Sequence, residues 1–317
     1  MKLITFKDIN DLNIQPKEYY SWAVEMIKNK NTAILPPKIS IKPYEGVFCN
    51  VMPSFIPSAN GDYEGVKVVT RYPERLPSLD SKILLLNAKS GDFLALMDAD
   101  WITAMRTGAV ATHSVMLLAK SNYKVIGMMG LGNVARATLY TLLEMNKDKE
   151  FIVKLYKFQG DEVLFKERFK DYKNVTFTYC DDYHSVVKGS DVVISCVTYA
   201  PNDFCADEDF DEGVLVVPIH TLGFTNCDFF FDKVFADDAG HVCHFKNFDK
   251  FRKFSEVNEV VNGLKPGREN DKERILAYNI GISVHDINYA AHIYELLKDK
   301  ASLPEINFNG PVDKYWI

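Results

Sequence analysis

A glycine-rich turn is the part of this sequence whose residue spacing points most directly to chemistry. It reads Gly130-Leu131-Gly132-Asn133-Val134-Ala135 and follows an apolar run at residues 124–129. A strand, a glycine turn and a helix in this order are typical of dinucleotide-binding sites. Gly130 permits the tight turn, Gly132 leaves room for a pyrophosphate, and Ala135 lets the helix pack closely on the strand. A chance glycine pair is the alternative, but the flanking pattern favours nucleotide binding.

Two cations lie on segments that precede this turn. Lys67 interrupts an apolar strand pattern at residues 65–69, and Arg106 lies within an apolar helical pattern that begins near residue 101. Each could be an ordinary solvated side chain, which is the more common state for a strand lysine or a helix arginine. Together they could bind a small carboxylate, because arginine offers bidentate recognition of that group.

A histidine follows the apolar run at residues 214–219, which predicts a buried parallel strand. Open α/β sheets bind their ligands beyond the carboxyl ends of such strands. Histidine titrates near neutral pH, so His220 could act as an acid or a base. A structural histidine that is hydrogen-bonded within the fold is the other interpretation.

The predicted strand at residues 151–156 ends without the acidic residue that usually binds the adenosine ribose. Lys157 follows it and could bind the 2′-phosphate of NADP, or it could be a surface lysine, so the choice between NAD and NADP stays open. No metal is expected, because His241, Cys243 and His244 are too close in sequence to converge and lack the spacing of zinc ligands.

The segments that would position these residues fall into two units. Helix-length spacers separate strands at residues 151–156, 174–179, 191–197, 214–219 and 233–237. This alternation predicts an α/β fold with a Rossmann-type, doubly wound parallel sheet over residues 121–286. Residues 1–120 mix short strand patterns with two long helical patterns, which predicts an α+β domain. A late helical pattern at 282–297 crosses back, so residues 287–317 are assigned to the first domain.

Composition narrows the class of protein. The 317 residues are 47% hydrophobic and 25% charged, which is ordinary for a globular enzyme of about two domains. A net charge of -6 without a basic block argues against a nucleic-acid partner. The sequence shows no signal-peptide pattern and no membrane-spanning run. The six cysteines are scattered, and we expect them to be small buried thiols in a reducing compartment, so the expected location is cytoplasmic.

Several segments taken together resemble the ornithine cyclodeaminase/μ-crystallin superfamily, over nearly the whole chain. The residues that carry the resemblance are 65–69 with Tyr72-Pro73, 91–98, 102–109, 130–136, Gly267-Arg268 and 281–286. The resemblance implies a Rossmann domain joined to a substrate-binding and dimerisation domain, in a homodimer.

The resemblance also implies roles for single residues. Lys67 and Arg106 match the pair that holds the substrate carboxylate in this superfamily. Lys38 stands in the place of a second arginine, which keeps the charge but loses the planar fork. Met52 belongs to a Met-Pro pair that lines the pocket. His220 stands where the superfamily has its catalytic acid/base, and Asp228 is the second candidate for that role.

The predicted function is hydride transfer between a nicotinamide cofactor, NAD or NADP, and the α-carbon of an amino acid. The substrate would be a small amino acid or keto acid, handled by an amino-acid dehydrogenase or an imine reductase. Ornithine cyclodeaminase activity, which yields proline and ammonia, is one alternative, and a non-catalytic NADPH-dependent binding protein is the other. The predicted cofactor contacts are Gly130, Gly132, Asn133, Val134, Thr107, Lys157, Thr198 and Gly281.

Overall fold

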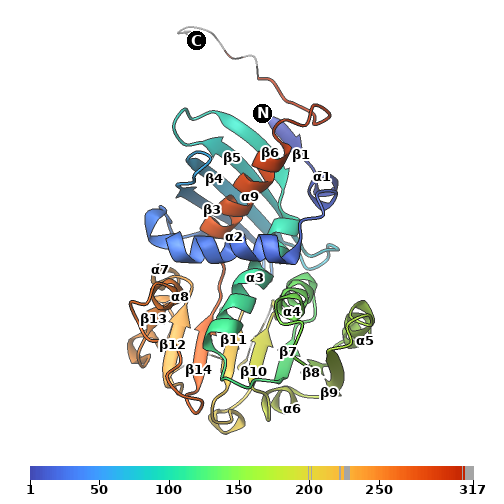
Figure 1. Ribbon diagram of the computed structural model, residues 1–317, viewed down its shortest axis with the longest axis vertical. Helices are drawn as coiled ribbons and strands as arrows, with labels where there is room; N and C mark the ends of the chain where they lie inside the picture. The colour runs from blue at the N-terminus through green and yellow to red at the C-terminus, as the bar shows by residue number, and fades with distance from the viewer. Residues whose placement is uncertain (199, 201, 221–222, 225–228, 309, 311–317) are drawn as a thin grey trace.

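The protein is described by a computed structural model that covers residues 1–198, 200, 202–220, 223–224, 229–308 and 310. It consists of two halves stacked one above the other, each built around one β-sheet (Figure 1). Helix α3 (Asp100–Leu118) runs between the two halves. The predicted α/β fold, with a parallel-sheet domain and a second domain, is confirmed.

The first half holds a six-stranded sheet whose order is β1-β6-β5-β4-β3-β2. Strand β1 is parallel to β6, and the other neighbouring pairs are antiparallel. The strands are β1 (Lys2–Ile4), β2 (Ile39–Ile41), β3 (Phe48–Ile56), β4 (Tyr63–Arg71), β5 (Leu79–Asn87) and β6 (Phe93–Asp98). Of these, β1 and β6 were not recognised as strands in the sequence.

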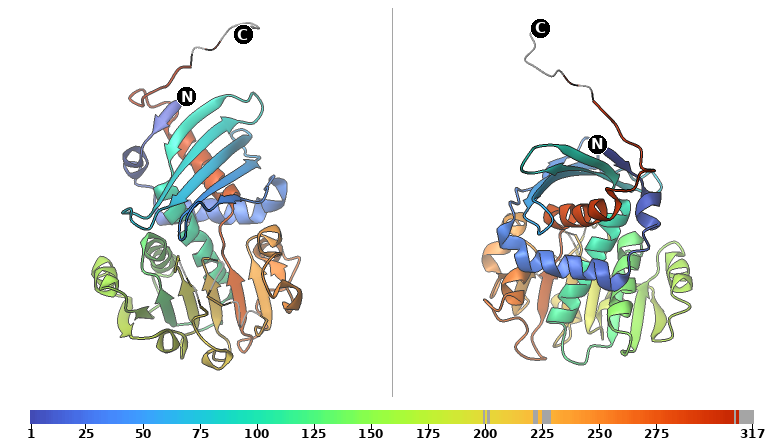
Figure 2. Two further views of the ribbon diagram at one scale, coloured as in Figure 1. Left: turned by 180° about the vertical axis from the view of Figure 1, so that it is seen from behind. Right: turned by 45° about the horizontal axis from the view of Figure 1, so that its top comes forward.

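Three further helices complete this half: α1 (Phe6–Asn10), α2 (Pro16–Asn29) and α9 (Ser283–Leu297). Helix α9 packs across β3, β4 and β5, and α2 lies beneath it at the junction of the two halves (Figure 2). Because side chains alternate along a strand, Lys67 of β4 points to the face that α9 covers, while Val66 and Val68 point to the opposite face.

The second half holds an eight-stranded sheet, all parallel, with the order β13-β12-β14-β11-β10-β7-β8-β9. Its strands are β7 (Val125–Met129), β8 (Phe151–Tyr156), β9 (Val175–Cys180), β10 (Val192–Ser195), β11 (Leu215–Pro218), β12 (Lys233–Ala236), β13 (Ser255–Glu256) and β14 (Ile275–Tyr278). Its helices are α4 (Asn133–Met145), α5 (Asp161–Arg168), α6 (Tyr183–Val187), α7 (Ala239–Val242) and α8 (Val257–Val261). Short 3-10 turns lie at Lys30–Thr32, Asp207–Asp209 and Phe248–Lys250.

Strands β13 and β14 are the elements of this sheet that the sequence pattern did not reveal. Strand β14 has only four residues, all buried, and it pairs with both β11 and β12. So short an apolar run has no periodicity that separates a strand from a loop. The residue boundaries of the two domains, at 120/121 and 286/287, stay a prediction.

The expectations about cysteines, membrane helices and location have different outcomes. Five cysteines lie in the described residues, all as free thiols; Cys180 is buried as expected, but Cys243 is exposed, so the expectation of uniform burial was wrong. Helices long and apolar enough to traverse a bilayer are not found in the described part of the chain. The cytoplasmic location and the lack of a nucleic-acid partner stay predictions.

Candidate functional site

The glycine turn joins β7 to α4 at the point where the order of strands in the sheet reverses. From β7 the chain runs outward through β8 and β9, then returns to place β10 on the other side of β7. Gly130 has φ +76, and a Cβ there would lie 2.5 Å from the backbone carbonyl carbon of Cys196. Only glycine fits, because the loop after β10 packs directly on it. Open α/β sheets bind ligands at such a switch point.

The space in front of the turn is open. Among the described residues, and apart from the neighbours of Gly132 in the chain, no atom lies within 4 Å of the position that a Cβ of Gly132 would take, and both Gly132 and Asn133 are exposed. Gly132 caps the first turn of α4, whose amino end carries partial positive charge. Ala135 is fully buried where α4 packs on the sheet. These residues fit the pyrophosphate of a dinucleotide.

The two predicted substrate cations converge on one buried carboxylate. Lys67 Nζ lies 2.9 Å, and Arg106 Nε 2.8 Å, from Oδ1 of Asp286 in α9. The exposed fractions of Lys67, Arg106 and Asp286 are 1%, 5% and 0%. The interpretation of either cation as a solvated surface residue is therefore wrong. We call these three residues the ion cluster.

Burial controls the electrostatics of the ion cluster. It lowers the pKa of Lys67 to about 8, although Asp286 acts in the opposite direction. Burial would also favour the neutral acid of Asp286, but the charges of Arg106 and Lys67 hold the pKa of this carboxyl below its usual value. Near neutral pH the cluster therefore contains two cations and one anion.

The guanidinium of Arg106 lies against Gly281, just past β14, at the carboxyl edge of the parallel sheet. Gly281 has φ +80, and a Cβ there would lie 2.9 Å from Nη1 of Arg106. The N–H of Gly281 donates to Oδ2 of Asp237, 2.8 Å away, directly after β12. Burial raises the pKa of Asp237. Burial also lowers the pKa of Lys38, whose charge interacts with Asp237 and Arg106.

Met52 lies beside Lys67 on the covered face of the sheet. The two residues are direct partners in the register of β3 and β4, and Met52 is buried. Its position in the first half agrees with a side chain that lines the space next to the ion cluster. Thr107 follows Arg106 in α3, where its hydroxyl donates to the carbonyl of Thr103 at 2.6 Å.

His220 lies at the carboxyl edge of the same sheet, past β11. Its Nε2 is 2.6 Å from Oγ of Ser195, the last residue of the neighbouring strand β10. The rings of His220 and Phe204 meet edge to face at 6.0 Å. Burial lowers the pKa of His220 to about 4, so the ring is neutral at pH 7. Asp228, the second candidate for an acid/base, lies outside the described residues.

The remaining predicted cofactor contacts are placed as follows. Val134 follows Asn133 in the first turn of α4, and Thr198 is an exposed residue in the loop past β10. Lys157 follows β8, is nearly half exposed and lies 2.5 Å from Asp181. That ion pair is compatible with either cofactor, so the choice between NAD and NADP stays open.

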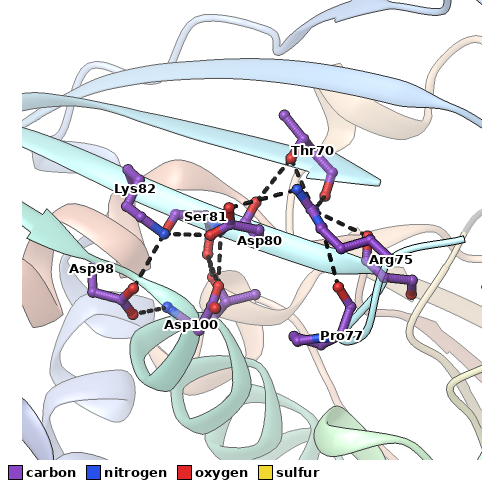
Figure 3. Close-up of polar contacts among 10 residues, drawn as sticks. Thr70, Arg75, Pro77, Asp80, Ser81, Lys82, Asp98 and Asp100 are labelled. Atoms are coloured by element: carbon purple, nitrogen blue, oxygen red, sulfur yellow. Dashed lines mark hydrogen bonds and ion pairs between the residues drawn. The ribbon is translucent and has the colours of Figure 1, made fainter. Parts of the chain in front are cut away.

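Three acidic residues near the start of α3, Asp80, Asp98 and Asp100, have carboxylate oxygens within 4.8 Å of one another, a spacing that could hold a metal ion. Figure 3 shows that these carboxylates already have partners. Lys82 binds Asp80 and lies 3.1 Å from Asp98, and Asp100 accepts from the backbone N–H of Ser81 at 2.8 Å. We therefore assign no metal to this group.

Sequence reasoning missed three residues of the site: Ser195, Asp237 and Asp286. One signal was available for Asp286, because it is an acid at a position of the 282–297 helical pattern that otherwise faces the core. A buried acid needs a buried cation as its partner, and Lys67, a charged residue in an otherwise apolar strand, was the candidate for that partner. No comparable signal was present for Ser195 or Asp237.

Comparison with known proteins identifies the family. Residues 20–301 match the ornithine cyclodeaminase/mu-crystallin family. Nodulation efficiency protein NfeD of Rhizobium meliloti is 26% identical over 280 residues, and the match covers 82% of this chain and 83% of that protein. N-((2S)-2-amino-2-carboxyethyl)-L-glutamate dehydrogenase of Staphylococcus aureus is 26% identical over 231 residues, and the match covers 68% of each chain.

A solved structure shares the fold. Thermococcus litoralis Delta(1)-pyrroline-2-carboxylate reductase, in complex with NADH and L-proline, superposes with a TM-score of 0.85 at 24% sequence identity, covering 96% of this chain and 100% of that one. The two sheets, the glycine turn and the match over residues 20–301 lead to one conclusion: this chain belongs to the ornithine cyclodeaminase/mu-crystallin family, as its sequence motifs predicted.

Proposed function

We propose that the protein is a nicotinamide-dependent oxidoreductase that interconverts an amino acid and the corresponding imino acid. When bound, the nicotinamide supplies or accepts the hydride at the α-carbon of the substrate. Two relatives support this reaction class, because one is named as a dehydrogenase of an N-substituted glutamate and the other as a reductase of a cyclic imino acid. Both act on a C–N bond beside a carboxylate.

The observation that carries the proposal is the convergence of Lys67 and Arg106 in a water-poor site. They come from different elements, β4 and α3, and both bind one carboxyl oxygen of Asp286. The terminal nitrogens of Arg106 lie against Gly281, at the edge where parallel sheets bind ligands. Lys67, Arg106 and Lys38 hold the substrate carboxylate, and Met52 lines the space beside them. Fixing the substrate in this way supplies much of the rate enhancement.

The residues around the glycine turn hold the cofactor in this proposal. Gly130 and Gly132 let the pyrophosphate approach the backbone, and Asn133 and Val134 offer the N–H groups at the amino end of α4. Thr107, Thr198 and Gly281 lie on the elements that border the cofactor site, and Lys157 stands where the adenosine ribose would be bound.

His220 is the residue we propose for moving the amino proton of the substrate. Its pKa of about 4 means that it is neutral and can accept a proton at pH 7, and Ser195 orients its Nε2. Asp228 is the alternative acid/base.

The experiment is a panel of amino acids and keto acids, the latter with ammonia or an amine, assayed with both cofactors. Absorbance of the reduced nicotinamide and release of ammonia are followed together. We expect net formation or consumption of NADH or NADPH. Ammonia released from ornithine without net NADH would identify a cyclodeaminase. Cofactor binding with no turnover of any substrate in the panel would contradict an enzymatic role and favour a binding protein.

We further propose that two copies of the chain associate through the face of the six-stranded sheet that α9 does not cover. This face is apolar and has a hollow of about 500 Å³. The side chains that line it include Pro53, Phe55, Val66, Leu84, Leu86 and Phe93. Apolar side chains that line an open sheet face in this way mark sites of protein interaction. Its occupant here is the matching face of a second copy, since the same surface on both subunits is self-complementary in a two-fold dimer.

Light scattering coupled to gel filtration tests this assembly. We expect the wild type to have twice the chain mass of 36.1 kDa and Val66→Asp to run as a monomer, because a charge would be buried in the interface. Val163→Asp on the exposed side of α5 is the matched control and should remain dimeric. A monomeric wild type would contradict the assembly.

A further inference from the structure

Asp286 is not needed to contact the substrate, yet it is the most buried charge of the ion cluster. It lies in the first turn of α9, and one of its oxygens, Oδ1, accepts from both Lys67 and Arg106. Its second oxygen, Oδ2, is also buried, and no hydrogen-bond partner for it is found among the residues that the structure describes. A carboxylate that is shielded from solvent in this way acts through its neighbours rather than on a ligand.

We propose that Asp286 is a positioning residue, an internal counter-ion that keeps Lys67 protonated and fixes both cations for one substrate carboxylate. The identity of the ligand rests on the proposed function; the charge relation does not. Two cations and one anion leave one net positive charge, which a single carboxylate neutralises. The Nε of Arg106 donates to Asp286, so the terminal nitrogens of Arg106, beside Gly281, remain oriented toward the sheet edge.

The surroundings of Lys67 explain why a counter-ion is required. Its direct partners across the sheet are Met52 of β3 and Ile83 of β5, both apolar. Charged groups reach it from the two helices packed on this face: Asp286 from α9, and Arg106 and Asp100 from α3. Without Asp286, a buried ammonium would face the guanidinium of Arg106. The neutral form of Lys67 would then have the lower free energy.

Two titratable groups beside Asp286 stay neutral over the relevant range. His285, next to it in α9, has a pKa lowered to about 3 by burial and stays neutral. Burial raises the pKa of Tyr289 well above its usual value, so it also stays neutral. Lys38 and Asp237 lie on the Arg106 side, where each one's charge acts on the pKa of the other. Lys67 is thus the group whose titration Asp286 controls.

The sign of the pH effect follows from linkage. The pKa of Lys67 is about 8 in the folded protein and 10.5 as a free side chain, so between these values the unfolded chain binds more protons. Stability therefore rises with pH in this window. Loss of Asp286 lowers the folded pKa further and moves the start of this rise to lower pH. Only the part of that move above pH 7 counts in this range, so the ratio of the two unfolding constants changes by at most about tenfold between pH 7 and pH 9.5.

The test compares urea unfolding of the full-length wild type and Asp286→Asn at pH 7 and pH 9.5, and it needs no substrate. We expect Asp286→Asn to be clearly less stable than the wild type at pH 7, and the ratio of their unfolding constants to fall several-fold, up to about tenfold, at pH 9.5, where Lys67 no longer needs a counter-ion. Asp191→Asn is the matched control: Asp191 binds Lys120 at 2.6 Å and two backbone N–H groups, and its deficit should be the same at both pH values. A pH-independent deficit in Asp286→Asn would overturn the proposal.

A second variant keeps the proposal testable if Asp286→Asn does not fold at pH 7. Asp286→Asn combined with Lys67→Met also removes the free-energy cost of deprotonating the buried lysine on folding, so this double variant should be more stable than the single one at pH 7. A double variant that is less stable would show that Asp286 acts only by packing. Once a substrate is known, its KM should rise above about pH 8 in the wild type and at lower pH in Asp286→Asn. Failure of the assay panel alone would leave the stability result standing.

Discussion

The two regions that make up the proposed site are built in opposite ways. The ion cluster is closed: three charged side chains from β4, α3 and α9 bind one another and exclude solvent. The glycine turn is open: it presents backbone, and no side chain of the part of the protein that the structure describes fills the position beside Gly132. The difference indicates that the carboxylate end is held ready by side chains that must be prepositioned, whereas the cofactor end needs only that side chains be absent.

The largest expected effect comes from breaking the closed region. Lys67→Ala or Arg106→Ala should lower kcat/KM by about 100-fold or more, because the substrate carboxylate is no longer fixed. Each should also lower the free energy of unfolding by about 3–5 kcal/mol, because part of the charge of Asp286 is left unpaired. Kinetics and urea unfolding are measured together. Lys124→Ala, which breaks an exposed 3.3 Å pair with Glu150, is the control and should change neither value. Wild-type kinetics in both variants would show that the ion cluster does not bind the substrate.

The open region should respond in a different way. Gly132→Val is expected to raise the Kd for NADH about 10- to 100-fold while leaving stability unchanged, because its side chain enters the space for the pyrophosphate. Gly130→Val should instead lower stability by about 2 kcal/mol or more, because of its positive φ and its contact with Cys196. Fluorescence titration with NADH and thermal unfolding separate the two outcomes. Normal NADH binding by Gly132→Val would disprove the cofactor position.

Acid should weaken the protein through its desolvated histidines. The pKa of His113, in α3, is lowered to about 4 by burial, against 6.5 for a free side chain. Between pH 6.5 and 4 the unfolded chain binds the extra proton, so stability is lost as pH falls through this window. His113→Phe should reduce the loss by on the order of 1–3 kcal/mol in urea unfolding. A pH slope in His113→Phe equal to that of the wild type would show that the burial of His113 is not the cause.

The smallest effect is expected at the outer end of the open region. Lys157→Ala should raise the Kd for NADPH by about fivefold or less, because an exposed ion pair is worth at most about 1 kcal/mol. The Kd for NADH should not change. Titrations of both cofactors, with exposed Lys170→Ala as control, give the answer. An equal weakening of NADH binding would show that Lys157 does not read the 2′-phosphate.

The glycine turn could be predicted from sequence because everything it requires is local. An apolar run, two glycines and a helix within about twenty residues determine the strand, the turn and the helix start. The ion cluster could be predicted only in part. Lys67 and Arg106 stood out, but Asp286 is 219 and 180 residues away from them along the chain. Such a contact follows from the packing of α9 on the first sheet, which no local pattern encodes.

The position of His220 illustrates the same limit. Its place after an apolar run predicted the carboxyl edge of the sheet, and the structure puts it past β11. Its partner Ser195 belongs to the neighbouring strand β10, and the order of strands in a sheet is not written in any one of them. The buried, neutral state of this ring therefore became visible only with the fold.

The insertion of β14 between β11 and β12 has a consequence for how the chain is made. The central part of the parallel sheet lacks a strand until residues 275–278 have been synthesised, and the other sheet lacks its covering helix until residue 297. Neither half can finish its core until residues 275–297 have left the ribosome. Nascent chains must therefore remain incompletely packed until these residues emerge, so a stop codon before them would leave both halves without a core element.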